Sequence, residues 1–193
     1  MPRTQTDTRE KILMVANDLF YRHGIRAIGV DTIIARSEVA KTTLYRYFPS
    51  KDDLVVAYLE INDWHFWRLF DEAIDRVPND PKQQLLEIFS WLDESIASPE
   101  CYGCPFLMVA AEFPEIDYPG HQVAIAHKQK LRDRLTELAR LVGIELVEEL
   151  SAMLSLLIDG AYAQRRLLGM HGNRVTLKKA AKIAIDAYAF GLE

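Results

Sequence analysis

The chain has 193 residues, of which 49% are apolar and 26% are charged, and its net charge is -5. This balance excludes disordered, collagen-like and low-complexity proteins. Eight prolines and nine glycines are too few for a protein built from many strands and tight turns. We therefore expect an all-α protein of about nine helices, with a core that needs no disulfides.

The charge is distributed unevenly along the chain. Up to Lys51 there are nine Lys and Arg against five Asp and Glu, a net charge of +4, whereas the remainder carries -9. A basic amino-terminal quarter on an acidic body is typical of a module that contacts phosphate. No apolar run reaches the roughly 18 to 20 residues of a membrane span, and the first ten residues lack the apolar core of a secretory signal. We expect a soluble, cytoplasmic chain with no membrane partner.

The first 50 residues predict three helices. From Thr8 the apolar residues recur at helical spacing, and Gly24 stands where a C-terminal cap belongs. A short helix from Val30 and another from about Ala40 to Phe48 follow, joined by a turn of three or four residues. The last two helices match the helix-turn-helix arrangement, in which the final helix lies in the DNA major groove.

The third predicted helix has the composition of a DNA-reading surface. Leu44 and Phe48 share an inward face with Val39 of the preceding turn. The side chains left for solvent or a partner are Lys41, Thr42, Thr43, Tyr45, Arg46 and Tyr47. Several of them donate to phosphate, and threonine hydroxyls and methyls contact base edges. For an isolated stretch of this length, a solvated face with incidental charge is the alternative.

A long fourth helix is predicted from Lys51 to about residue 76. Ser50 is its N-cap, and Asp53 is the capping-box partner three residues later. Asp80 caps the next helix, whose first position is occupied by proline. We expect the remaining helices at residues 81–97, 105–112, 121–142, 145–168 and 176–190.

A longer pattern runs through the amino-terminal helices. Residues 29–35 and 39–54 closely resemble the DNA-binding signature of the TetR family of bacterial transcriptional repressors, and the match spans roughly residues 8 to 56. This resemblance implies a helix-turn-helix DNA-binding domain at residues 1–50. It also implies a helical ligand-binding and dimerisation domain at residues 51–193, with the fourth helix linking the two.

By position, the resemblance implies that Thr42 and Thr43 read base edges. It assigns phosphate contacts to Lys41, Tyr45, Tyr47 and Lys51, with Arg46 suited to either role. The chain departs from the family in the turn, where Glu38 stands in place of the usual Gly and Ala40 in place of a frequent Ser or Thr. We expect Glu38 to occupy a conformation that Gly adopts more cheaply by roughly 1 kcal/mol, and Ala40 to offer no side-chain cap.

The same resemblance implies three partners: double-stranded operator DNA, a small-molecule effector and a second copy of the chain. Aromatic residues in the middle helices suit either core packing or a pocket for an apolar or aromatic ligand. The candidate ligand residues are Trp64, Trp67, Phe70, Trp91, Met108, His127, Asp159 and Tyr162. The candidate dimer residues, on the last two helices, are Ala152, Leu156, Ala163, Leu167, Ala181, Ile185 and Tyr188.

Cys101 and Cys104 form a C-x-x-C pair at a helix start, which favours thiolate and would suit a redox or electrophile sensor. The alternatives are small packing cysteines, or a zinc site that would need two further ligands. A helical enzyme or a lipid-binding protein is the alternative from another class. No motif supports it, because the sequence has no Gly-rich phosphate loop, no G-x-S-x-G and no H-E-x-x-H motif. We expect a regulator with no catalytic residue, cofactor or metal.

Overall fold

The structure is a computed structural model that describes residues 5–171 and 176–190. These residues form nine α-helices and one short 3₁₀ helix, without any strand, so the predicted all-α class is confirmed. In chain order the elements are α1 (Gln5–His23), α2 (Val30–Ser37), α3 (Lys41–Tyr47), α4 (Lys51–Asp75), α5 (Pro81–Ala97), α6 (Pro105–Glu112), α7 (Pro119–Val142), α8 (Val147–Leu168), η1 (Gly169–His171) and α9 (Leu177–Phe190). Within the described ranges, none of these helices has the length and apolar character needed to cross a bilayer.

Helix starts differ from the predicted positions by a few residues. α1 begins at Gln5 rather than Thr8, and α8 begins at Val147 rather than residue 145. The helix expected at residues 121–142 starts two residues earlier, because Pro119 and Gly120 also belong to α7. Proline is favoured in the first turn of a helix because its missing N–H would have no partner there.

The described residues divide into two compact units. The head unit contains the residues up to Trp64 together with Pro105–Ile125, and the body unit contains His65–Cys104 together with the residues from Ala126 onward. α6 therefore belongs to the head unit, although it is distant in sequence from α1, α2 and α3. The predicted domain boundary at residue 50 stays a prediction.

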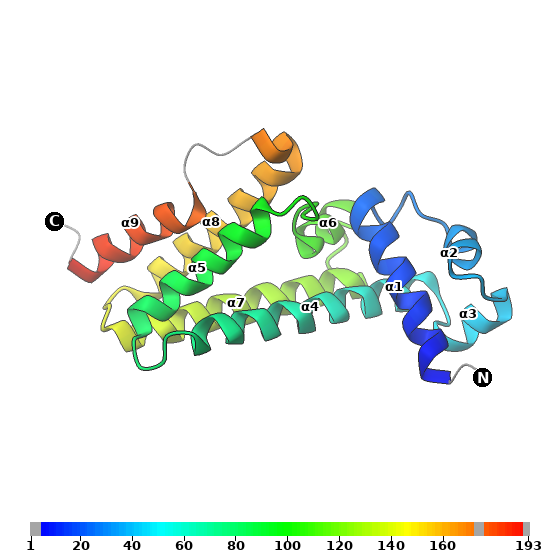
Figure 1. Cartoon of the computed structure of the whole chain (residues 1–193), viewed down its shortest axis with the longest axis horizontal. Coiled ribbons are helices and arrows are strands. Elements are labelled where there is room, and N and C mark those ends of the chain that lie inside the picture. Colours follow the sequence, from blue (N-terminus) through cyan, green and yellow to red (C-terminus); the bar gives the residue numbers. More distant parts are fainter. Residues whose placement is uncertain (1–4, 172–175, 191–193) are drawn as a thin grey trace. The chain divides into compact units, whose positions relative to one another are not determined.

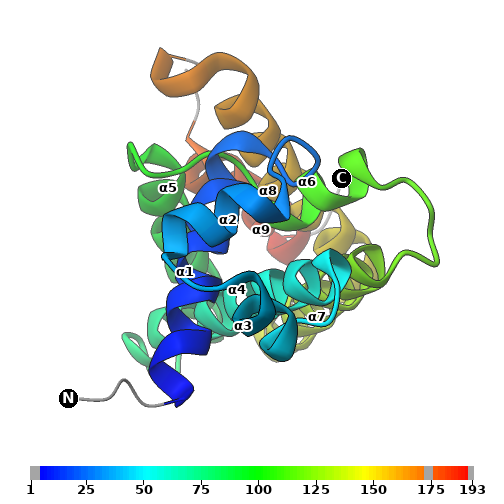
Figure 2. The same cartoon turned by 90° about the vertical axis from the view of Figure 1, so that its right-hand side faces the viewer.

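The head unit is built on contacts among α1, α2 and α3, which Figure 2 shows together. α1 ends as predicted at Gly24, which has a φ of +89° and donates its amide to the carbonyl of Phe20 at 2.9 Å. Phe20 packs edge-to-face on Tyr58 of α4, with ring centroids 5.5 Å apart. Both rings are fully buried, so they anchor α1 on the first half of α4.

α4 begins with the predicted capping box. The Ser50 amide donates to the Asp53 carboxylate at 2.9 Å, and the Asp53 amide donates to the Ser50 hydroxyl at 3.1 Å. Each side chain satisfies a backbone donor that the start of a helix leaves without an internal partner. This reciprocal pair fixes the point at which the chain leaves α3 and enters α4.

The body unit packs α5, α8 and α9 side by side (Figure 1). Asp80 caps α5 as predicted, accepting from the amide of Gln83 at 3.0 Å. Asp93, in the second half of α5, accepts from the amides of Leu177 and Lys178 at 2.7 and 2.8 Å, so α5 supplies a cap for the first turn of α9. Two amides bound by one carboxylate fasten α9 to α5.

Three of the predicted dimer residues lie inside the body unit. Ala181 and Ile185 are fully buried, so they cannot contact a second copy while α9 is folded on its own chain, and Tyr188, at 8% exposure, offers little surface. α9 packs on α5 and α8, and all three residues belong to the body core. Among the large apolar side chains described on α9, Ile183 is the exposed one, at 61%. On α8, by contrast, the predicted Leu156 and Leu167 are exposed.

Candidate nucleic-acid interface

The helix-turn-helix rests on a small apolar core. Ile33 of α2, Leu44 of α3 and Phe48 after α3 are at most 2% exposed, while Val39 in the turn is half-buried. Leu44 and Phe48 therefore face inward as predicted. Burying one face of a seven-residue helix is needed because so short a helix is not stable by itself.

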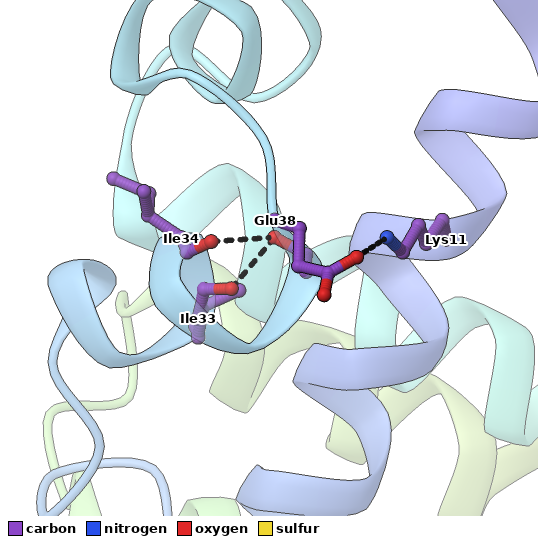
Figure 3. Close-up of polar contacts among 5 residues, drawn as sticks. Lys11, Ile33, Ile34 and Glu38 are labelled. Carbon is purple, nitrogen blue, oxygen red and sulfur yellow. Dashed lines mark hydrogen bonds and ion pairs between the residues drawn. The ribbon is translucent and has the colours of Figure 1, made fainter.

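The turn between α2 and α3 is held by two side chains (Figure 3). The hydroxyl of the buried Ser37 donates to the carbonyls of Ile33 and Ile34 at 2.6 and 3.3 Å, which satisfies acceptors at the end of α2. Glu38 has the left-handed conformation, with a φ of +53°, as predicted. Its carboxylate accepts from the ammonium of Lys11 on α1 at 3.1 Å. Ala40 is the N-cap of α3 and makes no side-chain cap, also as predicted.

Replacing Glu38 with Gly is expected to stabilise the protein by about 1 kcal/mol, because Gly adopts a positive φ without the steric cost of a Cβ. The exposed ion pair with Lys11 that this change removes contributes only about 0 to 1 kcal/mol. Urea unfolding of the two proteins measures the difference.

Glu38→Gln is the matched control, since it removes the charge and keeps the Cβ. It is expected to change the free energy of unfolding by less than about 0.5 kcal/mol. If Glu38→Gly and Glu38→Gln destabilise the protein equally, the ion pair contributes more to stability than relief of the positive φ at residue 38 does.

α3 presents most of its predicted contact residues outward. Lys41, Thr42, Tyr45 and Arg46 are exposed, whereas Thr43 and Tyr47 are half-buried. Lys41 pairs with Asp31 of α2 at 3.2 Å, and the Arg46 guanidinium lies over the ring of Tyr47 at 5.0 Å. Because exposed pairs of this kind are weak, both cations can turn to phosphate at little cost. Thr42 is more exposed than Thr43, and the base contacts expected of both stay a prediction.

Lys51 has a structural contact in addition to its predicted role. Its ammonium donates to the carbonyl of Ile25 at 2.6 Å and lies 5.9 Å from the centroid of the Phe20 ring. Burial lowers the pKa of Lys51, and the charges of Glu112 and Asp52 oppose that shift. A phosphate contact by Lys51 therefore shares its three donors with the turn after α1.

Two head residues that were not predicted from the sequence lie beside these elements. The guanidinium of Arg9 on α1 lies over the ring of Phe48 at 5.1 Å. Glu112 of α6 accepts from the amides of Ile25 and Arg26. The excess of basic residues before Lys51 was the sequence signal for Arg9, and no local signal pointed to Glu112.

The predicted ligand residues divide between the two units. In the body unit, the ring of Phe66 contacts those of Trp67, Trp91 and His127, with centroids 5.2, 5.2 and 4.7 Å apart, and it lies 6.1 Å from that of Phe70. We call these five residues the aromatic cluster. Except for the half-buried Phe66, all are at most 7% exposed.

The other predicted ligand residues lie outside this cluster. Asp159 forms an ion pair with Lys128, and Tyr162 is partly buried against the body core. Trp64 is 55% exposed and belongs, like Met108, to the head unit. Their roles in ligand binding stay predictions.

The body unit also contains a cavity that the sequence did not indicate. Its volume is about 410 Å³, within the range that accommodates a small ligand. It lies between the second half of α5 and the end of α8, lined by Asp93, Glu94, Ile96, Ala97, Gln164, Arg165, Gly169, Met170 and Thr176. The predicted ligand residues are not among these.

Cys101 and Cys104 are both buried, at 9% and 5% exposure, and are not joined by a disulfide. Buried structural cysteines are usually inert, so the burial of this pair favours the packing interpretation over a reactive, exposed thiol. Within residues 5–171 and 176–190, no group of three or more His, Cys, Asp or Glu is arranged to hold a metal ion.

Comparison with known proteins decides the family. Residues 12–58 match the family model described as bacterial regulatory proteins, tetR family. The chain is similar to SCO4454, a TetR-family transcriptional regulator from Streptomyces coelicolor, with 30% identity over 96% of this chain and 95% of that one and a TM-score of 0.86. The chain belongs to the TetR family. The predicted resemblance is thereby confirmed, and with it the helix-turn-helix as the DNA-binding element.

Two further relatives of this TetR-family chain carry more specific names. The transcriptional repressor SCO4008 of Streptomyces coelicolor is 28% identical over 93% of this chain and 95% of its own. The structure of the reduced form of Escherichia coli NemR has a TM-score of 0.77 at 17% identity, covering 94% of this chain and 97% of that one, which shows a shared fold. TetR-family proteins are transcription regulators and not enzymes, so this chain is a transcriptional regulator.

Proposed function

We propose that this chain is a ligand-responsive repressor that binds palindromic operator DNA as a dimer and leaves it when a small apolar or aromatic effector binds. The DNA-reading domain is proposed at residues 1–50, and the effector and dimerisation functions at residues 51–193. The observation that carries the proposal is the outward face of α3, where Lys41, Thr42 and Arg46 stand exposed on a buried apolar base. Repression is supported by the name of the relative SCO4008.

Dimerisation is supported by the exposed apolar surface of the last two long helices. Met153, Leu156, Leu167 and Leu168 of α8 are between 39% and 81% exposed, and Ile183 of α9 is 61% exposed. Scattered single apolar residues are normal on a surface, but a row along one helix marks an interaction site. A twofold dimer also provides the two recognition helices that a palindromic operator requires.

We place the effector in the body unit. The aromatic cluster offers stacking surfaces for an apolar or aromatic molecule, although its rings already contact one another and must separate to admit it. The 410 Å³ cavity near Arg165 is another location with room for a ligand. Trp67 and Trp91 lie in the cluster, whereas the third tryptophan, Trp64, belongs to the head unit. Quenching of tryptophan fluorescence by a bound compound in the Trp64→Phe variant therefore distinguishes the two locations.

Effector binding and operator binding are expected to oppose each other by the same factor, about 5- to 150-fold, because the two ligands prefer different states of one protein. Compounds are first selected by thermal shift. The affinity of each is then measured with and without saturating operator, using DNA that the wild-type protein selects from a random pool.

The opposite titration, operator affinity with and without the compound, is the internal control and must give the same factor. A compound with equal affinity for free and DNA-bound protein is not an inducer. Failure of the protein to select any sequence from the pool would contradict the proposed function itself.

A further inference from the structure

Glu112, the last residue of α6, is bound to the turn between α1 and α2. Its Oε1 accepts from the amide of Ile25 at 3.0 Å, and its Oε2 accepts from the amide of Arg26 at 2.6 Å. Both amides follow Gly24, where α1 has ended. A carboxylate that accepts two backbone N–H groups makes charge-assisted hydrogen bonds, which are about twice as strong as neutral ones.

The turn is shaped to admit this carboxylate. Gly24 has a φ of +89°, which side chains rarely adopt, and a Cβ at this position would lie 3.0 Å from Glu112 Oε1. Glycine is therefore required here both by the backbone conformation and by the approach of the carboxylate. The end of α1 and the end of α6 fit each other at this point.

The same residue of the turn is held from α4. Glu112 binds the N–H of Ile25, and the ammonium of Lys51 donates to its carbonyl at 2.6 Å. Lys51 is the first residue of α4, next to the capping box that follows the recognition helix. α6 and the start of α4 therefore meet at Ile25, a residue in the turn that leads to α2.

A second set of contacts joins the segment after α6 to the same elements. The Arg26 guanidinium lies 4.7 Å over the ring of Phe113, which stacks on Tyr118 with centroids 4.2 Å apart. The Tyr118 hydroxyl donates to Asp52 in the first turn of α4 at 2.9 Å. Burial, followed by this hydrogen bond, raises the pKa of Tyr118 above its usual value.

α6 is also joined to the body unit through the covalent chain. α6 starts at Pro105, directly after Cys104, where the first segment of the body unit ends. A change in the body unit that pulls on this junction acts on α6 through the covalent chain. The other end of α6 is bound to the turn between α1 and α2, which precedes the helix-turn-helix of α2 and α3.

We propose that Glu112 is a positioning residue for the DNA-reading helices: it clamps α6 to the turn between α1 and α2, so that a displacement of α6 is transmitted to α2 and α3. The operator readout of this inference rests on the proposed function, but the clamp itself does not. The carboxylate is needed because it serves two amides at once. A shorter or neutral side chain would leave at least one of them without its acceptor.

Amide hydrogen exchange of the full-length protein tests the clamp. In Glu112→Ala, exchange at Ile25 and Arg26 is expected to be about 10- to 100-fold faster, because opening of the turn no longer breaks two charge-assisted hydrogen bonds. The amide of Gly24, which donates to Phe20 within α1, is the control and is expected to keep its rate. Glu112→Gln retains one acceptor oxygen and is expected to give a smaller acceleration. This variant also allows the test to be made if Glu112→Ala does not fold.

Operator affinity tests the transmission. Glu112→Ala is expected to weaken binding of the selected DNA by about 5- to 150-fold, without an equal reduction at non-specific DNA. Glu115→Ala is the matched control, since Glu115 is exposed in the loop after α6 and its removal changes the net charge equally. Unchanged exchange at Ile25 and Arg26 would overturn the clamp, and faster exchange with unchanged operator affinity would overturn the transmission.

A substitution that adds a methyl group beside α6 provides an independent test. A Cβ at Gly120 would lie 2.9 Å from the Tyr118 ring and 3.2 Å from side-chain carbons of Val109 and Val55, so Gly120→Ala must displace one of them. We expect this variant to accelerate exchange at Ile25 as Glu112→Ala does, and the two changes to be non-additive in operator affinity. Additive effects would show that α6 and the turn act separately.

A wild-type protein that binds no DNA would contradict the proposed function. The exchange measurement would still decide whether Glu112 clamps the turn.

Discussion

A chain carrying both Leu156→Glu and Leu167→Glu is expected to be monomeric and to bind operator DNA about 100- to 10,000-fold more weakly than the wild type, because it lacks the second recognition helix. The two leucines are 73% and 81% exposed. They lie eleven residues apart on α8, about three helical turns, and so share one face. Burying two carboxylates against the same face of a second copy leaves them without partners.

Light scattering measures the oligomeric state of this variant, and the unfolding free energy shows whether each protomer stays intact. Exposed positions tolerate such changes within about 0.5 kcal/mol. Leu141→Glu is the matched control, since Leu141 is 64% exposed on α7, outside the proposed interface. A double variant that remains dimeric would place the interface on a different surface.

Two substitutions in α3 are expected to weaken DNA binding in different ways. Lys41→Ala should weaken all sequences alike and reduce the slope of log affinity against log salt by about 1 for each phosphate that is no longer neutralised. Thr42→Ala should instead change the preference among operator variants by about 1 to 3 kcal/mol. Lys41 is the better probe of a phosphate contact than Lys51, because Lys51 also binds the carbonyl of Ile25.

Salt titrations of wild type and both variants, on the selected operator and on a set of single-base variants, separate the two effects. Arg132→Ala, at an exposed position of α7, is the control for net charge and should leave the slope unchanged. A reduced slope in Thr42→Ala or altered base preference in Lys41→Ala would reverse the assignment of the two side chains.

Features set by neighbouring residues were predictable from the sequence. The capping box of Ser50 and Asp53 and the cap of α5 by Asp80 join residues three apart, and the left-handed conformation of Glu38 followed from its place in a known turn. These interactions depend on local geometry alone. The all-α fold and the outward face of α3 followed from helical periodicity in the same way.

Features set by the packing of distant segments were not predictable. Glu112 binds the amide of a residue 87 positions away, and no spacing in the sequence marks that pair. Periodicity identifies the apolar faces of α9 but cannot tell which of them is covered by α5, and so Ile185 was assigned to the wrong contact. Aromatic spacing likewise identified Trp67 and Trp91 as inward-facing, whereas it could not locate the cavity beside Arg165.

The attachment of α9 to its own α5 has a consequence for the exchange of chains between copies of the proposed dimer. Asp93 binds the first two amides of α9 within one chain, so α9 is held in place before a dimer forms. A helix that is already capped and packed has little tendency to cross over to a neighbour, which disfavours domain swapping. Chains should therefore separate and re-pair as intact folded units, and mixing two differently labelled dimers without denaturant should yield heterodimers in which each α9 remains with its own chain.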